Sequence, residues 1–222
     1  MRRALQAVVV FLVFFVAPVS AEHSPHYDVA CPAVSASIVL DPGHGGADPG
    51  AVNEEFGLYE RDLNLEIATR AAELLTEAGY SVALTRDDNE TELANSERGE
   101  IANACAAAVL VEIHLNAAED PEINYSHVFW GEKEKDLALT LLMRQALVPL
   151  NIPAHEIDRF DNGGLLRAKM PSVLVEAVFL SNPEEARQLA SGTRQEEIAQ
   201  AISNGVTNWM ELTAQIPAGQ IG

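Results

Sequence analysis

The nine residues Ile38–Gly46, IVLDPGHGG, join a short apolar run to a glycine-rich polar turn. The run Ile38–Leu40 has the length of a buried strand, and the Asp-Pro-Gly sequence after it ends that strand. Further apolar runs occur at 80–84, 109–115, 127–130 and 173–175, with helical patterns between them. Strands that alternate with helices predict an α/β fold: a single domain with a mainly parallel, twisted sheet and helices on both faces.

The predicted helices cover 63–79, 96–107, 135–148, a segment that starts at Pro183, and 193–212. Asn182 is a good N-cap, and proline fits the first helical position after it. Thr193 and Glu196 have the spacing of a capping box for the last helix. Residues 151–170 have no regular pattern, and we expect an irregular segment with a turn at 162–164.

The N-terminus resembles a secretory signal peptide. Arg2 and Arg3 precede an apolar run at 5–16, and small residues follow at 19–21. The run is shorter than the roughly 20 apolar residues of a membrane span. We therefore favour export with cleavage over an uncleaved N-terminal anchor, and expect no stable membrane insertion after cleavage. The predicted division is a signal peptide at 1–21, a linker at 22–36, the α/β domain at 37–213 and a tail at 214–222.

The chain is strongly acidic, with a formal net charge of −19 from 33 acidic and 14 basic residues. Such a surface repels nucleic acid, so nucleic acid is not an expected partner. In an exported protein the two cysteines, Cys31 and Cys105, allow one disulfide. Cys105 is equally consistent with a buried free thiol on an alanine-rich helix. Nothing in the sequence indicates an oligomer, and we predict a monomer.

Four polar residues occupy positions where chemistry is expected. Active sites of parallel sheets lie beyond the carboxyl ends of the strands, and His44, His114 and Glu176 all lie at or near such ends. Glu60 lies at the start of a helix. Alone, His114 has an ordinary explanation as a core residue and Glu60 as an acid at a helix N-terminus. Together, His44, Glu60 and His114 are the donor set of a catalytic zinc site, and Glu176 is a candidate general base.

Four sequence blocks resemble the zinc-dependent N-acetylmuramoyl-L-alanine amidases, also called type 3 amidases: residues 38–51, 58–65, 111–117 and 169–182. The resemblance implies that Zn2+ is bound by His44, Glu60 and His114 and that Glu176 is the catalytic acid and base. It also implies a peptidoglycan substrate, cut between N-acetylmuramic acid and L-alanine, and a protein exported to the periplasm, cell wall or medium.

Some residues depart from the family pattern. Glu112 replaces a small residue, and strand alternation places it on the same face as His114. We interpret Glu112 either as a partner that orients an imidazole or as a change in the charge of the site. Asn116 is a second candidate for supporting the site. Ser126-His127 replaces a Gly-x-Glu pattern, and we expect His127 to be exposed on an edge strand.

Two alternatives to the amidase remain open at this stage. One is a zinc peptidase or deacetylase that acts on another exported substrate. The other is a wall-binding protein that keeps the fold without catalysis. The segment between 116 and 127 is too short for the inhibitory helix that some relatives carry there.

Overall fold

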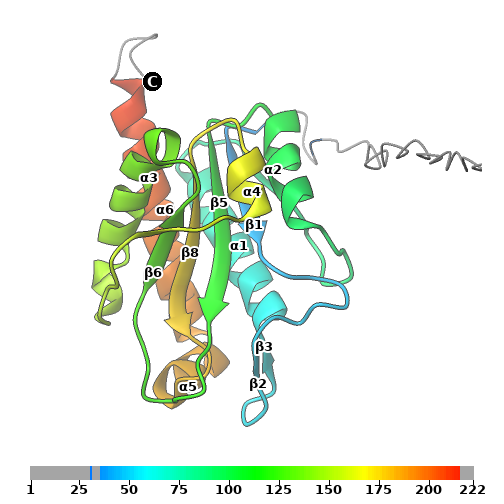
Figure 1. Cartoon of the computed structure of the whole chain (residues 1–222), viewed down its shortest axis with the longest axis vertical. Helices are drawn as coiled ribbons and strands as arrows, with labels where there is room; N and C mark the ends of the chain where they lie inside the picture. Colours follow the sequence, from blue (N-terminus) through cyan, green and yellow to red (C-terminus); the bar gives the residue numbers. More distant parts are fainter. Residues whose placement is uncertain (1–30, 32–35, 216–222) are drawn as a thin grey trace, which may run out of the picture.

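A computed structural model describes Cys31 and residues 36–215 (Figure 1). Its main sheet has six strands in the order β4-β1-β5-β8-β6-β7. The four strands from β4 to β8 are parallel, whereas β6 runs antiparallel to β8. The mainly parallel α/β sheet is therefore confirmed. The strands are β1 (Ile38–Pro42), β4 (Val82–Leu84), β5 (Val109–Asn116), β6 (His127–Trp130), β7 (Asp158–Arg159) and β8 (Ser172–Phe179).

Helices cover both faces of the sheet, as predicted. Figure 1 shows α2 and α4 on one face and α1 and α6 on the other. The side chains of β1 alternate between these faces: Ile38 and Leu40 join the larger core, and Val39 joins the smaller one. The helices are α1 (Glu60–Glu77), α2 (Asn95–Ala104), α3 (Lys133–Ala146), α4 (Gly163–Arg167), α5 (Pro183–Ala190) and α6 (Thr193–Ala214), with a 3-10 turn η1 (Val148–Leu150).

The structure corrects several local predictions. Residues 151–170 contain β7 and α4, two elements too short to produce a periodic pattern. A hairpin of β2 (Val52–Asn53) and β3 (Leu58–Tyr59) was not predicted, for the same reason. Helix α2 ends at Ala104 rather than near 107, because the chain takes a left-handed conformation at Ala106, with φ 52°.

The two predicted helix caps have different outcomes. The Asn182 side chain accepts hydrogen bonds from the backbone N–H groups of Glu184 and Glu185, which confirms this N-cap. The capping box at Thr193 is wrong. Gly192, with φ 82°, is the N-cap of α6, and no side-chain cap is formed. Thr193 is already inside the helix, so its hydroxyl cannot act from the cap position.

Cys31 and Cys105 form a disulfide, which decides between the two alternatives for these cysteines. The bridge attaches the segment before β1 to the end of α2. The predicted signal peptide lies outside the described residues, as does most of the linker and tail, so these boundaries stay predictions. Within the described part of the chain, no helix has both the length and the apolar character that crossing a bilayer requires.

Candidate metal centre

The loop after β1 carries His44 in an uncommon conformation. His44 is in the left-handed region, with φ 62°, which is a costly conformation that tends to occur at functional sites. The preceding Gly43 lies against the imidazole of His114: a Cβ on Gly43 would lie 2.1 Å from an atom of that ring. The glycine-rich sequence thus allows the loop to pass directly beside the second histidine.

Two buried arginines hold this loop in place. Arg86 donates from Nε to the carbonyl of Pro42 (2.9 Å) and from Nη2 to the carbonyl of Gly43 (2.9 Å). Arg98, on α2, donates to the carbonyl of His44 (2.9 Å) and forms a buried ion pair with Asp41 (2.8 Å). The loop carbonyls therefore have fixed partners, which maintain the backbone that orients His44.

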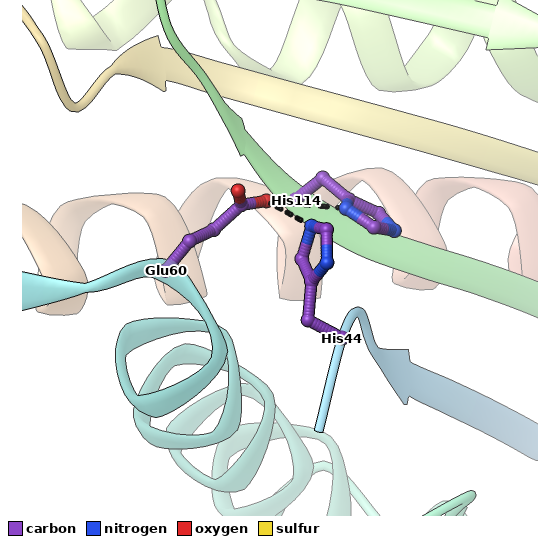
Figure 2. A group of neighbouring side chains, drawn as sticks. All are labelled: His44, Glu60 and His114. Carbon is purple, nitrogen blue, oxygen red and sulfur yellow. Dashed lines mark hydrogen bonds and ion pairs between the residues drawn. The ribbon is translucent and has the colours of Figure 1, made fainter. Parts of the chain in front are cut away.

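His44, Glu60 and His114 converge from three different elements (Figure 2). Glu60 Oε1 lies 3.1 Å from His44 Nε2 and 3.1 Å from His114 Nδ1. The two imidazole rings meet edge to face, with 4.9 Å between their centroids. Two imidazole nitrogens and one carboxylate oxygen directed at a common point fit the donor set of a zinc site with one open position.

The Glu60 side chain is almost completely buried and fully hydrogen-bonded. Its Oε2 accepts from the backbone N–H of Ala51 (2.8 Å), and its Oε1 accepts from that of Leu115 (3.0 Å). Burial alone would raise the pKa of Glu60, but its hydrogen bonds to His114 and His44 outweigh burial, so the pKa lies well below its usual value. The carboxylate is therefore kept ionised, as a metal ligand must be.

Asp48 supports His44 from the side opposite Glu60. Its Oδ2 lies 2.7 Å from His44 Nδ1, an arrangement in which Nδ1–H donates and leaves Nε2 directed at Glu60. Burial lowers the pKa of His44, but its contacts with Glu60 and Asp48 outweigh this effect and raise the pKa overall. In the metal-free protein these contacts therefore favour the protonated imidazole.

Glu176 lies beside this cluster. It is the Cα partner of His114 across β5 and β8, and its Oε2 accepts a hydrogen bond from the side-chain amide of Asn116. Burial raises the pKa of Glu176 to about 7, with a further contribution from the negative charge of Glu60. A carboxyl group with this pKa can both accept and donate a proton near neutral pH.

One cavity of about 410 Å³ joins these groups. His44, Glu60, His114 and Glu176 all line it, with Arg98, Asn162 and Phe160 among the other wall residues. The structure thus brings the four side chains that the sequence indicated to the wall of one cavity.

Glu112 and His127 differ from expectation. Glu112 is fully buried, and neither of its carboxylate oxygens has a hydrogen-bond partner among the described residues, so a contact that orients an imidazole has no support. Burial, followed by the charge of Asp41, raises the pKa of Glu112 well above its usual value and favours the neutral form. His127 is neither exposed nor on an edge strand, because β6 is paired on both sides, with β8 and β7.

Three residues that support the site were not predicted from the sequence: Asp48, Arg86 and Arg98. Asp48 lies within the first sequence block, four residues after His44, and this spacing was the available signal. No local signal identified the arginines, since their partners in the loop after β1 lie more than 40 residues away in the sequence.

Known proteins share both sequence and fold with this chain. The family model described as N-acetylmuramoyl-L-alanine amidase matches residues 38–208. The uncharacterized protein YqiI of Bacillus subtilis is 31% identical over 85% of this chain and 91% of its own length. The amidase LytC of the same organism is 32% identical over 80% of this chain, which spans only 36% of LytC.

A solved structure gives the same result. The N-acetylmuramoyl-L-alanine amidase AmiC2 of Nostoc punctiforme is similar with a TM-score of 0.73 and 32% identity, over 78% of this chain and 96% of that one. The family match covers every strand of the sheet and all four candidate site residues. On this evidence the chain belongs to the N-acetylmuramoyl-L-alanine amidase family of enzymes.

Proposed function

We propose that this chain is a zinc-dependent hydrolase that cuts the amide bond between N-acetylmuramic acid and L-alanine in peptidoglycan. The observation that carries the proposal is the convergence of His44, Glu60 and His114 on one point, with Glu176 in the wall of the same cavity. Similarity to proteins named as amidases of this bond supports the choice of substrate.

Each residue has a distinct role in this proposal. His44, Glu60 and His114 would hold the zinc ion, which when bound polarises the scissile carbonyl and acidifies a water molecule. Glu176 accepts the proton of the attacking water and then delivers it to the departing amine of L-alanine. Asn116 holds the Glu176 carboxylate, and Asp48 holds the His44 imidazole.

The disulfide and the N-terminal sequence both support a location outside the cytoplasm. Disulfides persist in oxidising compartments. The Cys31–Cys105 bridge packs in the smaller core, which includes Cys105. We propose that the mature protein is exported, acts on peptidoglycan in the periplasm, cell wall or medium, and works as a monomer.

A Glu176→Gln variant tests the proposed acid and base. The substitution preserves shape but removes proton transfer, so we expect stem-peptide release to fall by about 100- to 10,000-fold while zinc content is unchanged. Mass spectrometry of digested peptidoglycan measures the products, and elemental analysis of the same sample measures zinc. Glu184→Gln, on the exposed start of α5, is the matched control.

Three kinds of result would contradict the proposal. Wild-type rates of peptide release by Glu176→Gln would remove Glu176 from the mechanism. Fragments cut within the stem peptide, or sugars that have lost only acetyl groups, would instead identify a peptidase or a deacetylase. Full activity after removal of all bound metal would exclude zinc dependence.

A further inference from the structure

A second group of side chains that could hold a metal ion consists of His127, His155 and Asp158, and lies beside Glu176 on the sheet. His127, in β6, is the Cα partner of Glu176 across an antiparallel strand pair, and directly opposed residues in such a pair point to the same face of the sheet. The neighbouring edge strand β7 contributes Asp158, and the segment that leads into β7 contributes His155. None of these three side chains has a part in the proposed hydrolysis.

Backbone pairing fixes the three positions relative to one another. Asp158 is the Cα partner of Phe129, two residues after His127. The N–H of His155 donates to the carbonyl of Ser126 at 2.8 Å, and Arg144 Nε donates to the carbonyl of His155 at 2.8 Å. The cluster is therefore anchored through hydrogen bonds of the main chain rather than through mobile side chains alone.

The side chains meet at the carboxylate of Asp158. Its Oδ2 lies 2.9 Å from His127 Nε2 and 3.5 Å from His155 Nδ1. In a tetrahedral zinc site with bonds of about 2.1 Å, neighbouring donor atoms are roughly 3.4 Å apart. These two distances lie on either side of this value, and all three donor atoms lie within 4.8 Å of one another, so a shared ion requires only side-chain movement.

We propose that His127, His155 and Asp158 form a second site, for a late first-row divalent cation such as Zn2+. Two imidazoles and one carboxylate suit this class of metal. The acidic chain, with a net charge of −19, attracts cations. His155 and Asp158 are about half exposed, so an ion has access and retains positions for water.

Aromatic neighbours restrict the two imidazoles. The ring of Phe129 lies 3.9 Å from that of His127, and the ring of Tyr125 lies 4.9 Å from that of His155, measured between centroids. Burial lowers the pKa of His127 and so favours the neutral imidazole, the form that binds metal. The aromatic neighbours thus hold the rings in place, and the neutral His127 imidazole can bind a metal ion through Nε2.

A metal-free arrangement of the same groups is the competing interpretation. His127 would then donate to Asp158, and His155 Nδ1 would donate to the carbonyl of Glu156 at 3.2 Å. The two interpretations differ in the number of metal ions that the chain holds, and in which substitutions remove each ion.

The test is zinc stoichiometry in the purified protein after dialysis at low micromolar free zinc. We expect two zinc ions per wild-type chain, one in His155→Ala/Asp158→Asn, one in His44→Ala/His114→Ala, and none in the combined variant. Glu156→Gln, an exposed neighbour of the cluster, is the control and should retain two.

A second measurement covers the case in which a variant is less stable. Zinc should still raise the melting temperature of His44→Ala/His114→Ala, and this increase should disappear when His155→Ala/Asp158→Asn is added. One zinc ion per wild-type chain, or two that persist in His155→Ala/Asp158→Asn, would overturn the second site. Neither result bears on the proposed amidase site, because its zinc is removed by different substitutions.

Discussion

Asp48 shows how a single exposed side chain can orient a proposed metal ligand. Its carboxylate holds Nδ1 of His44 at 2.7 Å, which leaves Nε2 for the proposed metal ion. Without this contact the imidazole can rotate and lose its basicity as a ligand. His44 would then bind metal through a ring that no longer has a fixed orientation.

An Asp48→Ala variant should therefore bind zinc about 10- to 100-fold more weakly, with little change in the free energy of unfolding of the metal-free protein. Zinc titration by calorimetry measures the affinity. Asp87→Ala, an exposed acid in a nearby loop, should bind zinc as tightly as wild type. Equal affinities for wild type and Asp48→Ala would show that Asp48 does not orient His44.

Glu112 makes stability depend on pH. Its pKa is raised in the folded protein by burial and by Asp41. The unfolded chain loses this proton near pH 4.5, whereas the folded chain retains it to a higher pH. The stability associated with the protonated form is thus complete below about pH 4.5 and is lost as pH rises toward the folded pKa, by about 1.4 kcal/mol per pH unit.

A Glu112→Gln variant removes this dependence because glutamine does not ionise. We expect its free energy of unfolding to exceed that of wild type increasingly as pH rises above 4.5, and to be close to wild type at pH 4. Urea unfolding at several pH values gives the difference. A gap that is constant with pH would show that Glu112 has the same pKa in both states.

At the scale of elements, helix α2 fixes the conformation of the loop after β1. Arg98 extends from this helix to Asp41 and to the carbonyl of His44, while Gly99 lets the helix pack against α4, since a Cβ there would lie 2.4 Å from the carbonyl oxygen of Gly164. The helix has no residue among the candidate ligands, yet it fixes the backbone on which His44 depends.

Replacing Arg98 with alanine leaves the buried carboxylate of Asp41 without its ionic partner. Loss of one member of a buried pair costs about 3–5 kcal/mol, and we expect this loss in the free energy of unfolding together with weaker zinc binding. Arg187→Ala removes an exposed ion pair on α5 and should change stability little. If Arg98→Ala is as stable as Arg187→Ala, Arg98 does not stabilise the loop after β1.

At the scale of the whole molecule, the Cys31–Cys105 bridge joins the start of the described chain to α2 across 74 residues of sequence. A bridge of this separation restricts the unfolded chain strongly. Its loss should therefore lower the free energy of unfolding without altering the sheet, which has its own core on each face.

We expect the Cys31→Ala/Cys105→Ala variant to be about 2–4 kcal/mol less stable than wild type in urea. Reductant should lower the stability of wild type by a similar amount and leave that of the double variant unchanged. If reductant has no effect on wild type, the bridge does not form in solution.

The sequence alone was sufficient for the alternation of strands and helices, because periods of 2 and 3.6 residues are local properties of the chain. It also indicated His44, Glu60, His114 and Glu176, since each was expected at or near the end of a strand or helix within a recognisable block, although β8 continues three residues beyond Glu176. It did not indicate β7, α4 or the β2–β3 hairpin, because these short segments lack the run of three apolar residues that marked the equally short β1, β4 and β6.

Only the tertiary structure decided which residues meet. The partnership of Arg98 with Asp41, the disulfide and the cluster of His127 with Asp158 each join residues at least 31 positions apart. Strand alternation predicted the face of the sheet on which Glu112 lies. That its carboxylate has no hydrogen-bond partner follows from tertiary packing, in which Gly164 of α4 lies directly against it. Such contacts depend on strand order and register, which arise from burial of the whole core and are not encoded in any short segment.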